Sequence, residues 1–258
     1  MSGESAVPID PRFRQRLIEV RRHEGRRRLR LVVGALASAT AIAAAWGLSR
    51  SPLLDVDHVR LTGAEHTQLL SVIQTAGSLP GRPMVDLDEG AAASQIERLP
   101  WVADARVRRE WPNTVVIDVR ERAPAASVPA ENGGWALVDG TGRVLEPVRD
   151  APADQPMLEG VPAVGEPGTE VAPRTRGPLE VARALTPAMR LYVSAVARAH
   201  DGALQLRLRS EGVVHLGDRD ALAAKLLAAE TVLAHVDDSS AVAALDVRVP
   251  KSPVLTRW

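Results

Sequence analysis

The pattern of apolar and charged residues changes along this chain of 258 residues. Residues 31–48 contain no charged side chain, whereas the chain from residue 55 onward mixes short apolar and polar stretches. In that longer part, some stretches alternate strictly and others place apolar residues three and four positions apart. Alternation is typical of half-buried strands, and the second spacing is typical of amphipathic helices. The pattern predicts an apolar segment followed by a globular part of the α+β class.

The uncharged segment is long enough to cross a membrane. Eighteen helical residues extend over ~27 Å, close to the ~30 Å hydrocarbon core of a bilayer. Arg30 and Arg50 close the segment, and Trp46 lies near its second end, where an interfacial tryptophan anchors a span. A buried core helix would show a polar face, but only two hydroxyl side chains interrupt this segment. We therefore predict a transmembrane helix at residues 31–48.

Charge predicts the orientation of this span. Residues 1–30 hold nine arginines and four acidic residues, a net charge of +5, and the remaining 228 residues have a net charge of −5. The positive-inside rule places residues 1–30 in the cytoplasm and residues 49–258 outside it. The residues expected to set this topology are Arg26, Arg27, Arg28, Arg30 and, at the far end, Trp46. Beside a span this role accounts for the basic tail, so we predict membrane contact and no nucleic-acid partner.

A cleavable signal peptide is the alternative interpretation of the same segment. Residues 43–45 are three alanines, which resemble the small-residue site of a signal peptidase. The basic region would then be about thirty residues long, which exceeds that of ordinary signal peptides. We therefore favour an uncleaved, single-pass anchor.

A short linker, residues 49–54, leads to a first domain predicted at residues 55–126. Residues 55–63 alternate as a strand, and residues 66–77 and 88–99 show helical spacing, with Asp88 as an N-cap. Two further alternating strands flank a turn at residues 111–113. This β-α-α-β-β order predicts a small sheet with one face covered by two helices.

The second domain is predicted at residues 127–258 as an antiparallel meander with one late helix. A segment rich in proline and glycine, residues 123–134, is expected to be a hinge, and residues 147–178 are expected to be mostly loop. Asp139-Gly140 predicts a hairpin turn, and Thr186-Pro187 predicts a helix start. The remaining predicted elements are a short strand at 156–160, strands at 191–197, 204–208 and from 213, a helix from 220, and a last strand near 244–249.

These features resemble a known family. The element order, the stretch "LPWVADARVRREWPNTVVIDVRERAPAA" (residues 99–126) and the single span behind a basic tail are similar to the FtsQ/DivIB cell-division proteins. The resemblance covers residues 31–258. It implies a POTRA domain followed by a β-domain, and a non-enzymatic scaffold at the division septum. The partners that it implies are FtsB/FtsL-like coiled-coil proteins and other membrane proteins of the divisome.

Enzymatic chemistry finds little support in the sequence. The absence of cysteine excludes disulfides, thiol catalysis and thiolate metal sites. The six histidines are scattered without metal-ligand spacing, and no serine-hydrolase motif occurs. We predict no catalytic, metal or cofactor residues and no small-molecule substrate. The alternative function is a signal-anchored or secreted cell-wall hydrolase with an unrecognised site. A second alternative is a POTRA-containing outer-membrane translocation protein, which would need further modules or a terminal barrel.

The segment around residue 250 is the candidate partner-binding site. Pro250 and Pro253 donate no ladder hydrogen bonds, which confines this segment to a sheet edge or the end of a strand. The prolines either blunt an edge against aggregation or border an edge that accepts a partner strand. The family resemblance implies an edge that accepts a partner strand. It implies that Arg248 matches the family's basic residue. An aromatic residue often follows that basic residue in the family, and this chain has Val249 there. The predicted contact residues are Val247, Arg248, Val249, Pro250, Lys251, Ser252 and Val254.

Overall fold

The computed structural model describes the backbone of residues 11–77, 79–236 and 242–258, and the side chains from residue 29 onward within these ranges. Contacts divide the chain into two compact units, which are described separately. The first comprises residues 1–58, 80–87 and 109–115, and the second comprises residues 59–79, 88–108 and 116–258. Arg26, Arg27 and Arg28, predicted to set the topology, lie outside the residues whose side chains are described.

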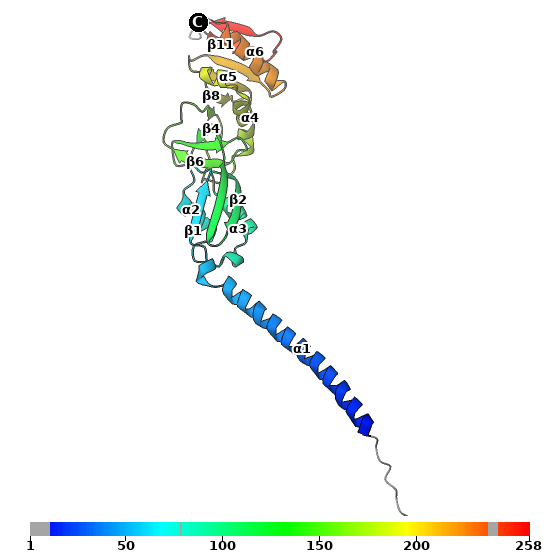
Figure 1. Ribbon diagram of the computed structural model, residues 1–258. Helices are drawn as coiled ribbons and strands as arrows, with labels where there is room; N and C mark the ends of the chain where they lie inside the picture. Colours follow the sequence, from blue (N-terminus) through cyan, green and yellow to red (C-terminus); the bar gives the residue numbers. More distant parts are fainter. Residues whose placement is uncertain (1–10, 78, 237–241) are drawn as a thin grey trace, which may run out of the picture. The chain divides into compact units, whose positions relative to one another are not determined.

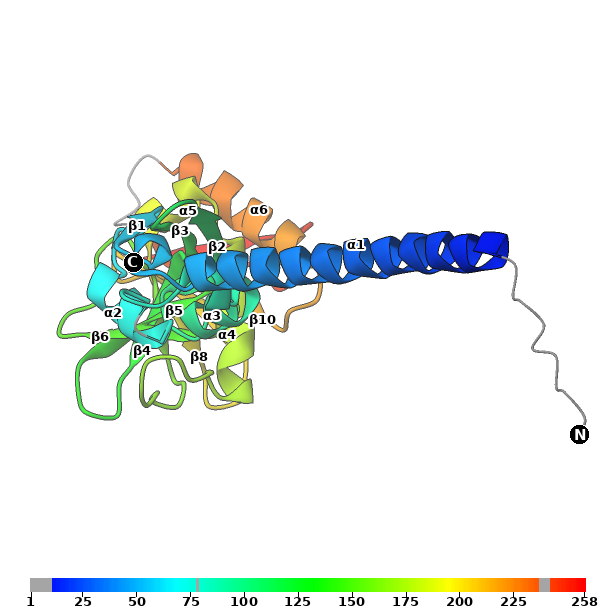
Figure 2. The ribbon, with the colours of Figure 1, turned by 60° about the horizontal axis from the view of Figure 1, so that its bottom comes forward.

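One long helix, α1, runs from Pro11 to Ser49 (Figures 1 and 2). Its stretch Leu29–Ser49 is apolar enough to cross a membrane, and none of it is buried against protein. These 21 residues extend over ~32 Å as a helix. The stretch contains the predicted span, residues 31–48. Near its end, the Arg50 guanidinium lies 5.1 Å from the centre of the Trp46 ring, a cation–π arrangement.

The first domain has the predicted β-α-α-β-β order. Its three strands form a sheet in the order β1-β3-β2. As predicted, the Asp88 carboxylate caps α3, accepting a hydrogen bond from the Ala91 amide at 2.9 Å. One 3-10 turn, η1, precedes β1, and a second, η2, lies between α2 and α3 in the chain. The bounds are η1 Pro52–Leu54, β1 His58–Thr62, α2 Leu69–Thr75, η2 Met84–Asp86, α3 Glu89–Ile96, β2 Val102–Glu110 and β3 Thr114–Glu121.

The second domain is built on a nine-stranded sheet in the order β12-β11-β10-β9-β8-β7-β4-β5-β6. Its strands are β4 Pro124–Pro129, β5 Trp135–Asp139, β6 Val144–Val148, β7 Met157–Glu159, β8 Val193–Arg198, β9 Leu204–Leu208, β10 Val213–Gly217, β11 Val242–Asp246 and β12 Val254–Arg257. Its helices are η3 Pro173–Thr175, α4 Arg176–Ala184, α5 Pro187–Tyr192 and α6 Leu222–Ala234. The α+β class is therefore confirmed.

Three strand pairs are parallel, which the predicted meander did not include. The strand β7 lies between β4 and β8 and is parallel to both, and β10 is parallel to β11. Parallel neighbours need a long crossover, and α6 provides it between β10 and β11. The short strand expected at residues 156–160 is thus a central strand rather than an addition at the margin.

One segment expected to be a hinge contains regular structure. The expected hinge at 123–134 includes β4, which pairs with β5 and β7, and residues 125–128 are all buried. Its two prolines lie at the ends of the strand, where a missing donor is tolerated. Burial on both faces removes the alternation that would have indicated a strand. The segment 147–178 is mostly loop, as predicted, and contains the expected short strand as β7, with η3 and the start of α4 near its end.

The core of the second domain lies between the sheet and two helices. The helices α4 and α6 contact each other, and α4 lies against β4 and β8 while α6 lies against β10. Leu226, Ala229 and Leu233 of α6 are buried, with Leu222 partly buried, and so are Leu204, Leu206 and Leu208 of β9. The shared cluster includes Leu179, Val181, Leu226, Leu233, Leu158, Val196, Leu206, Val214 and Leu245.

Contacts between the two domains include a small apolar cluster, an ion pair and a hydrogen bond from Arg143 Nη2 to the Arg98 carbonyl at 2.7 Å. Trp101 packs with Leu137 and Leu145. The Arg122 guanidinium donates to the Val102 carbonyl at 2.9 Å and to Asp139 Oδ2 at 2.8 Å. Only two residues, 122 and 123, separate β3 from β4. The connection is therefore short, and the segment expected to be a hinge consists largely of the strand β4.

Candidate partner-binding edge

The candidate site lies where β11, a turn and β12 follow one another. β11 pairs with β10 on one side and with β12 on the other, with Leu245 opposite Leu255 and Asp246 opposite Val254. Leu245 is fully buried, and Leu255 packs against the same core. These two leucines hold β12 on the sheet, while the rest of β12 is exposed.

The predicted last strand ends earlier than expected. β11 stops at Asp246 rather than near Val249, and residues 247–253 form a turn between β11 and β12. The Val247 amide donates to the His215 carbonyl at 3.1 Å, and the Ser252 amide closes the turn onto the Val249 carbonyl at 3.0 Å. Two prolines explain the position of the turn, because neither donates a ladder hydrogen bond and both fix φ. The edge is therefore β12.

An ion pair at the start of the turn orients Arg248. Its Nε donates to Asp246 Oδ2 at 2.9 Å, and its Nη2 donates to the same oxygen at 2.6 Å. The side-chain hydrogen bond from Arg248 is the main cause that holds the pKa of Asp246 below its ordinary value. The arginine packs beside Gly217, where a Cβ would lie 3.1 Å from Arg248 Cγ. Arg248 is exposed, so its charge is accessible to a partner.

The predicted contact residues fall into three groups. Val247 is fully buried and faces the core, so it offers no surface. Arg248, Val249, Lys251 and Ser252 are exposed on the turn, and Pro250 is partly buried there. Val254 alone belongs to β12. The sequence interpretation missed the other residues of this strand, Leu255, Thr256 and Arg257. A β-branched and apolar stretch directly after Pro253 was the available signal.

The two edges of the nine-stranded sheet differ. At the β6 edge, the Val144 amide donates to the Thr169 carbonyl at 2.9 Å, and the Val144 carbonyl accepts from the Gly168 amide at 2.8 Å. A loop thus pairs with the first residue of β6 on its outer side. No comparable segment pairs with the outer side of β12 among the described residues. In an antiparallel strand, alternate residues direct both backbone groups outward, so β12 presents unused donors and acceptors.

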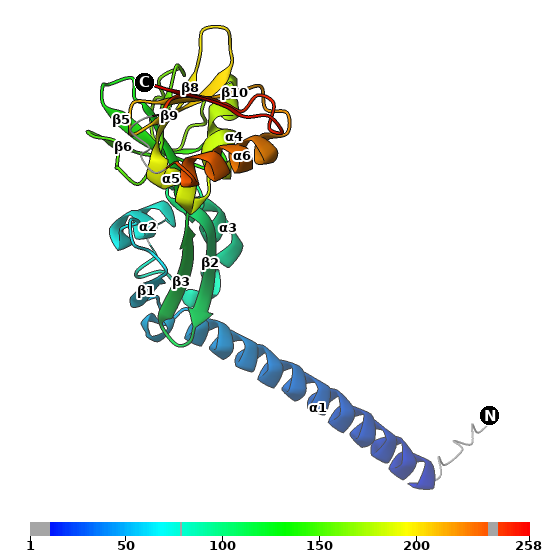
Figure 3. The ribbon, with the colours of Figure 1, turned by 90° about the horizontal axis from the view of Figure 1, so that it is seen from above.

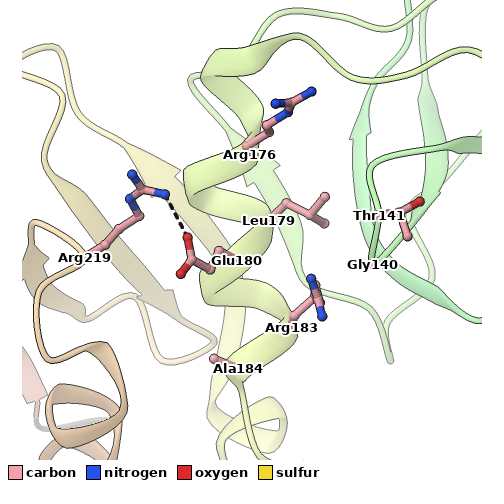
Figure 4. Close-up of a pocket in the computed structure, with 8 residues that line it drawn as sticks. All are labelled: Gly140, Thr141, Arg176, Leu179, Glu180, Arg183, Ala184 and Arg219. Atoms are coloured by element: carbon pink, nitrogen blue, oxygen red, sulfur yellow. Dashed lines mark hydrogen bonds and ion pairs between the residues drawn. The ribbon is translucent and has the colours of Figure 1, made fainter.

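A polar pocket lies against α4 (Figure 4). It has a volume of about 640 Å³, and Arg176, Arg183 and Arg219 line it together with Glu180 and the turn at Gly140 and Thr141. Arg219 donates to Glu180 at 2.8 Å. The Thr141 hydroxyl donates to Asp139 at 2.7 Å, so the hydroxyl and the Glu180 carboxylate of the pocket are each engaged with another residue. The described residues also contain no cluster of three or more candidate metal ligands.

Comparisons with known proteins identify the family. A model described as POTRA domain, FtsQ-type, matches residues 54–122, and one described as cell division protein FtsQ/DivIB, C-terminal, matches residues 126–248. The chain belongs to the FtsQ/DivIB family. The second match ends at Arg248, so β12 lies beyond the matched residues.

Curated FtsQ proteins show the same likeness. The chain is 35% identical over 170 residues to the cell division protein FtsQ of Anaeromyxobacter sp. (strain K), covering 60% of this chain and 56% of that protein. It is 30% identical over 198 residues to FtsQ of Mycolicibacterium smegmatis, covering 76% and 57%. The matched part thus spans less than two thirds of each relative. The solved extracytoplasmic domain of DivIB from Geobacillus stearothermophilus is 17% identical, covering 45% of this chain and 95% of that one, with a TM-score of 0.33.

The matched family model and the curated relatives are described as cell division proteins, which supports a divisome role for the chain. The family is one of scaffolds rather than enzymes, and the comparisons give no support to a cell-wall hydrolase. The apolar stretch of α1 fits a single-pass membrane protein at the division site.

Proposed function

We propose that this chain is a non-enzymatic scaffold that binds an FtsB/FtsL-like partner by adding a partner strand to β12. In this proposal α1 anchors the chain in the cytoplasmic membrane, residues 1–30 lie in the cytoplasm, and the domains at 55–126 and 127–258 lie outside it. The surplus of arginine before the apolar stretch supports this orientation. Septum assembly would then depend on the partners that the scaffold holds in place.

The observation that carries the proposal is the difference between the two sheet edges. Gly168 and Thr169 already pair with Val144, the first residue of β6, while the four-residue strand β12 has no outer partner among the described residues. Strand addition needs such an edge, and side chains beside it provide specificity. Arg248 lies next to this edge, and a partner carboxylate could replace or share its contact with Asp246.

The alternation of backbone directions in β12 gives a direct test. We expect one of two double-proline variants, Val254→Pro with Thr256→Pro or Leu255→Pro with Arg257→Pro, to remove the two outward amides. Two lost hydrogen bonds of about 1 kcal/mol each predict a loss of affinity of about 30-fold. The other variant removes amides that pair with β11, and we expect it to lower the thermal unfolding midpoint as well.

The measurement is the binding of the purified full-length chain to a co-purified FtsB/FtsL-like pair from the same genome. Lys251→Ala changes a predicted contact in the turn but outside the ladder, so we expect it to lower the affinity less than the proline variants do. Retention of full affinity by both proline variants would exclude strand addition at β12. Loss of affinity in Lys251→Ala but not in the proline variants would move the site to the turn.

A further inference from the structure

Three separate segments of the first compact unit are joined at the end of α1. The Asp57 and His58 amides donate to the Asn113 carbonyl at 2.9 and 3.1 Å. The Val56 amide donates to the Arg82 carbonyl at 2.9 Å, and Arg109 Nη1 donates to the Met84 carbonyl at 3.3 Å. These bonds hold residues 50–58, 80–87 and 109–115 together, and we call this group the juxtamembrane tip. Figures 1 and 3 show the β2–β3 turn beside the end of α1.

Each segment of the juxtamembrane tip exposes one large apolar side chain. Leu53 is 75% exposed, Trp111 is 54% exposed and Val85 is 39% exposed. Single exposed apolar residues are ordinary on protein surfaces. Three of them, contributed by three segments that hydrogen bonds bring together, are a grouping that needs an explanation.

The position of this surface along the chain indicates what covers it. The apolar stretch of α1 ends at Ser49, and η1 begins three residues later at Pro52. Arg50 donates to Asp86 Oδ1 at 3.1 Å, which ties the segment of Val85 directly to the end of the span. A bilayer adds roughly 5–8 Å of headgroup layer on each side of its hydrocarbon core. Segments held this close to the last apolar turn lie within or next to that layer.

Charge distinguishes the kind of contact. The juxtamembrane tip holds three arginines, Arg50, Arg82 and Arg109, and four acidic residues, Asp55, Asp57, Asp86 and Glu110. It therefore has no surplus of positive charge that would attract anionic lipids. Tryptophan and aliphatic side chains instead favour the interface for their apolar surface and, in tryptophan, for the indole N–H.

We propose that Leu53, Val85 and Trp111 insert into the headgroup layer, so that the juxtamembrane tip is a second membrane contact beside α1. The proposal rests on α1 crossing the membrane, but it requires neither the partner nor the β12 edge. The first domain then rests on the bilayer surface instead of turning freely on residues 49–51.

The absence of cysteine makes spin labelling straightforward. The full-length chain, one copy per nanodisc of phosphatidylcholine, carries a nitroxide at Leu53→Cys or Val85→Cys. Two exposed positions serve as references, Ile42→Cys within the span and Leu191→Cys on α5. The measurement is the accessibility of each label to oxygen, which concentrates in lipid, and to a water-soluble nickel chelate. We expect labels at 53 and 85 to be several-fold less accessible to nickel than the label at 191, and open to oxygen.

A second variant tests the role of the indole. Trp111→Ser in each labelled background should raise nickel accessibility at 53 and 85, whereas Leu191→Ser should leave it unchanged. Nickel accessibility equal to that of the 191 label would overturn the proposal. Labels closed to both reagents would indicate cover by protein and would overturn it as well. A contact that appears only after adding phosphatidylglycerol would exclude the apolar mechanism. If the label at Ile42→Cys were as accessible to nickel as the label at Leu191→Cys, α1 would not span the bilayer.

Discussion

Arg122 and Asp139 form an ion pair, with 2.8 Å between Nη1 and Oδ2, that joins the end of β3 to the turn after β5. Both side chains are largely buried, and Asp139 also accepts hydrogen bonds from the Thr141 and Arg143 amides. Burial alone would raise the pKa of Asp139, but the hydrogen bonds from Thr141 and Arg122 outweigh it, and the pKa is lowered. The carboxylate is therefore charged and depends on these donors.

We expect Arg122→Met to lower the free energy of unfolding by about 2–3 kcal/mol. The substitution keeps the aliphatic stem but leaves a buried carboxylate without its cation. Urea unfolding monitored by circular dichroism measures the change. Arg120→Met, two residues earlier and exposed, is the matched control and should change stability by less than about 0.5 kcal/mol. Equal effects of the two substitutions would contradict a specific role for the ion pair.

The pKa of the Glu121 carboxyl is strongly lowered. Burial tends to raise the pKa, but hydrogen bonds from Thr67 and His66 outweigh burial and lower it to about 2. The Thr67 amide donates to Oε1 at 2.6 Å, and the His66 ring lies 3.0 Å from Oε2. That ring also stacks on Trp101 with 4.0 Å between the ring centres. The carboxylate therefore fixes the segment before α2 against the small cluster that joins the two domains.

The sign of the resulting pH dependence follows from the lowered pKa. Glu121 stabilises the fold above its unfolded pKa of about 4.5, and this contribution is lost as the pH falls from about 4.5 to about 2. We expect Glu121→Gln to lower the unfolding midpoint at neutral pH and to reduce its fall over this acid range. Thermal unfolding at pH 7 and at several values below 4.5 measures both effects. Glu65 is exposed, so Glu65→Gln is the control and should change neither the midpoint at neutral pH nor its fall in acid. An unaltered acid profile in Glu121→Gln would refute the assignment.

Gly217 controls the environment of Arg248. Its φ of 72° lies in the left-handed region, and an added Cβ would press on Arg248. We expect Gly217→Ala to lower the free energy of unfolding by about 1–2 kcal/mol and to weaken partner binding by displacing the arginine. Chemical denaturation and the binding assay measure these effects separately. Gly90→Ala, in the exposed first turn of α3, should instead stabilise the fold by about 0.5–1 kcal/mol. A neutral Gly217→Ala would show that the turn relaxes easily.

Local signals in the sequence predicted the elements whose determinants are local. Asp88 caps α3 and Thr186 caps α5, accepting from the Met189 amide at 3.1 Å, because each carboxylate or hydroxyl satisfies an amide within its own turn. The Asp139-Gly140 turn formed as predicted for the same reason, with Asp139 Oδ1 accepting from the Thr141 amide. The alternating strands β2, β3 and β9 each have one face toward solvent, so their pattern was visible.

Elements that depend on distant partners were not predicted. β4 is buried on both faces and reads as alanine, serine and proline, which alone are typical of a linker. The parallel pairing of β7 with β4 and β8 brings together residues far apart in sequence, and no short-range signal encodes it. The candidate site moved for the same reason. The end of β11 depends on its pairing with β12, in which Leu245 lies opposite Leu255. The binding roles of Arg248, Val249 and Val254 stay predictions.

The proposed strand addition at β12 has a consequence for how many strands the large sheet can take up. A sheet open at both ends can add strands without limit, and copies of it can chain into a filament. Here the Gly168 and Thr169 loop pairs with Val144, which obstructs the other edge at the first residue of β6. Under the proposal β12 is the edge that accepts a strand, and two copies that met there edge to edge would use both sites. Assembly through this sheet would then stay small, and larger arrays would be built from the partner's contacts.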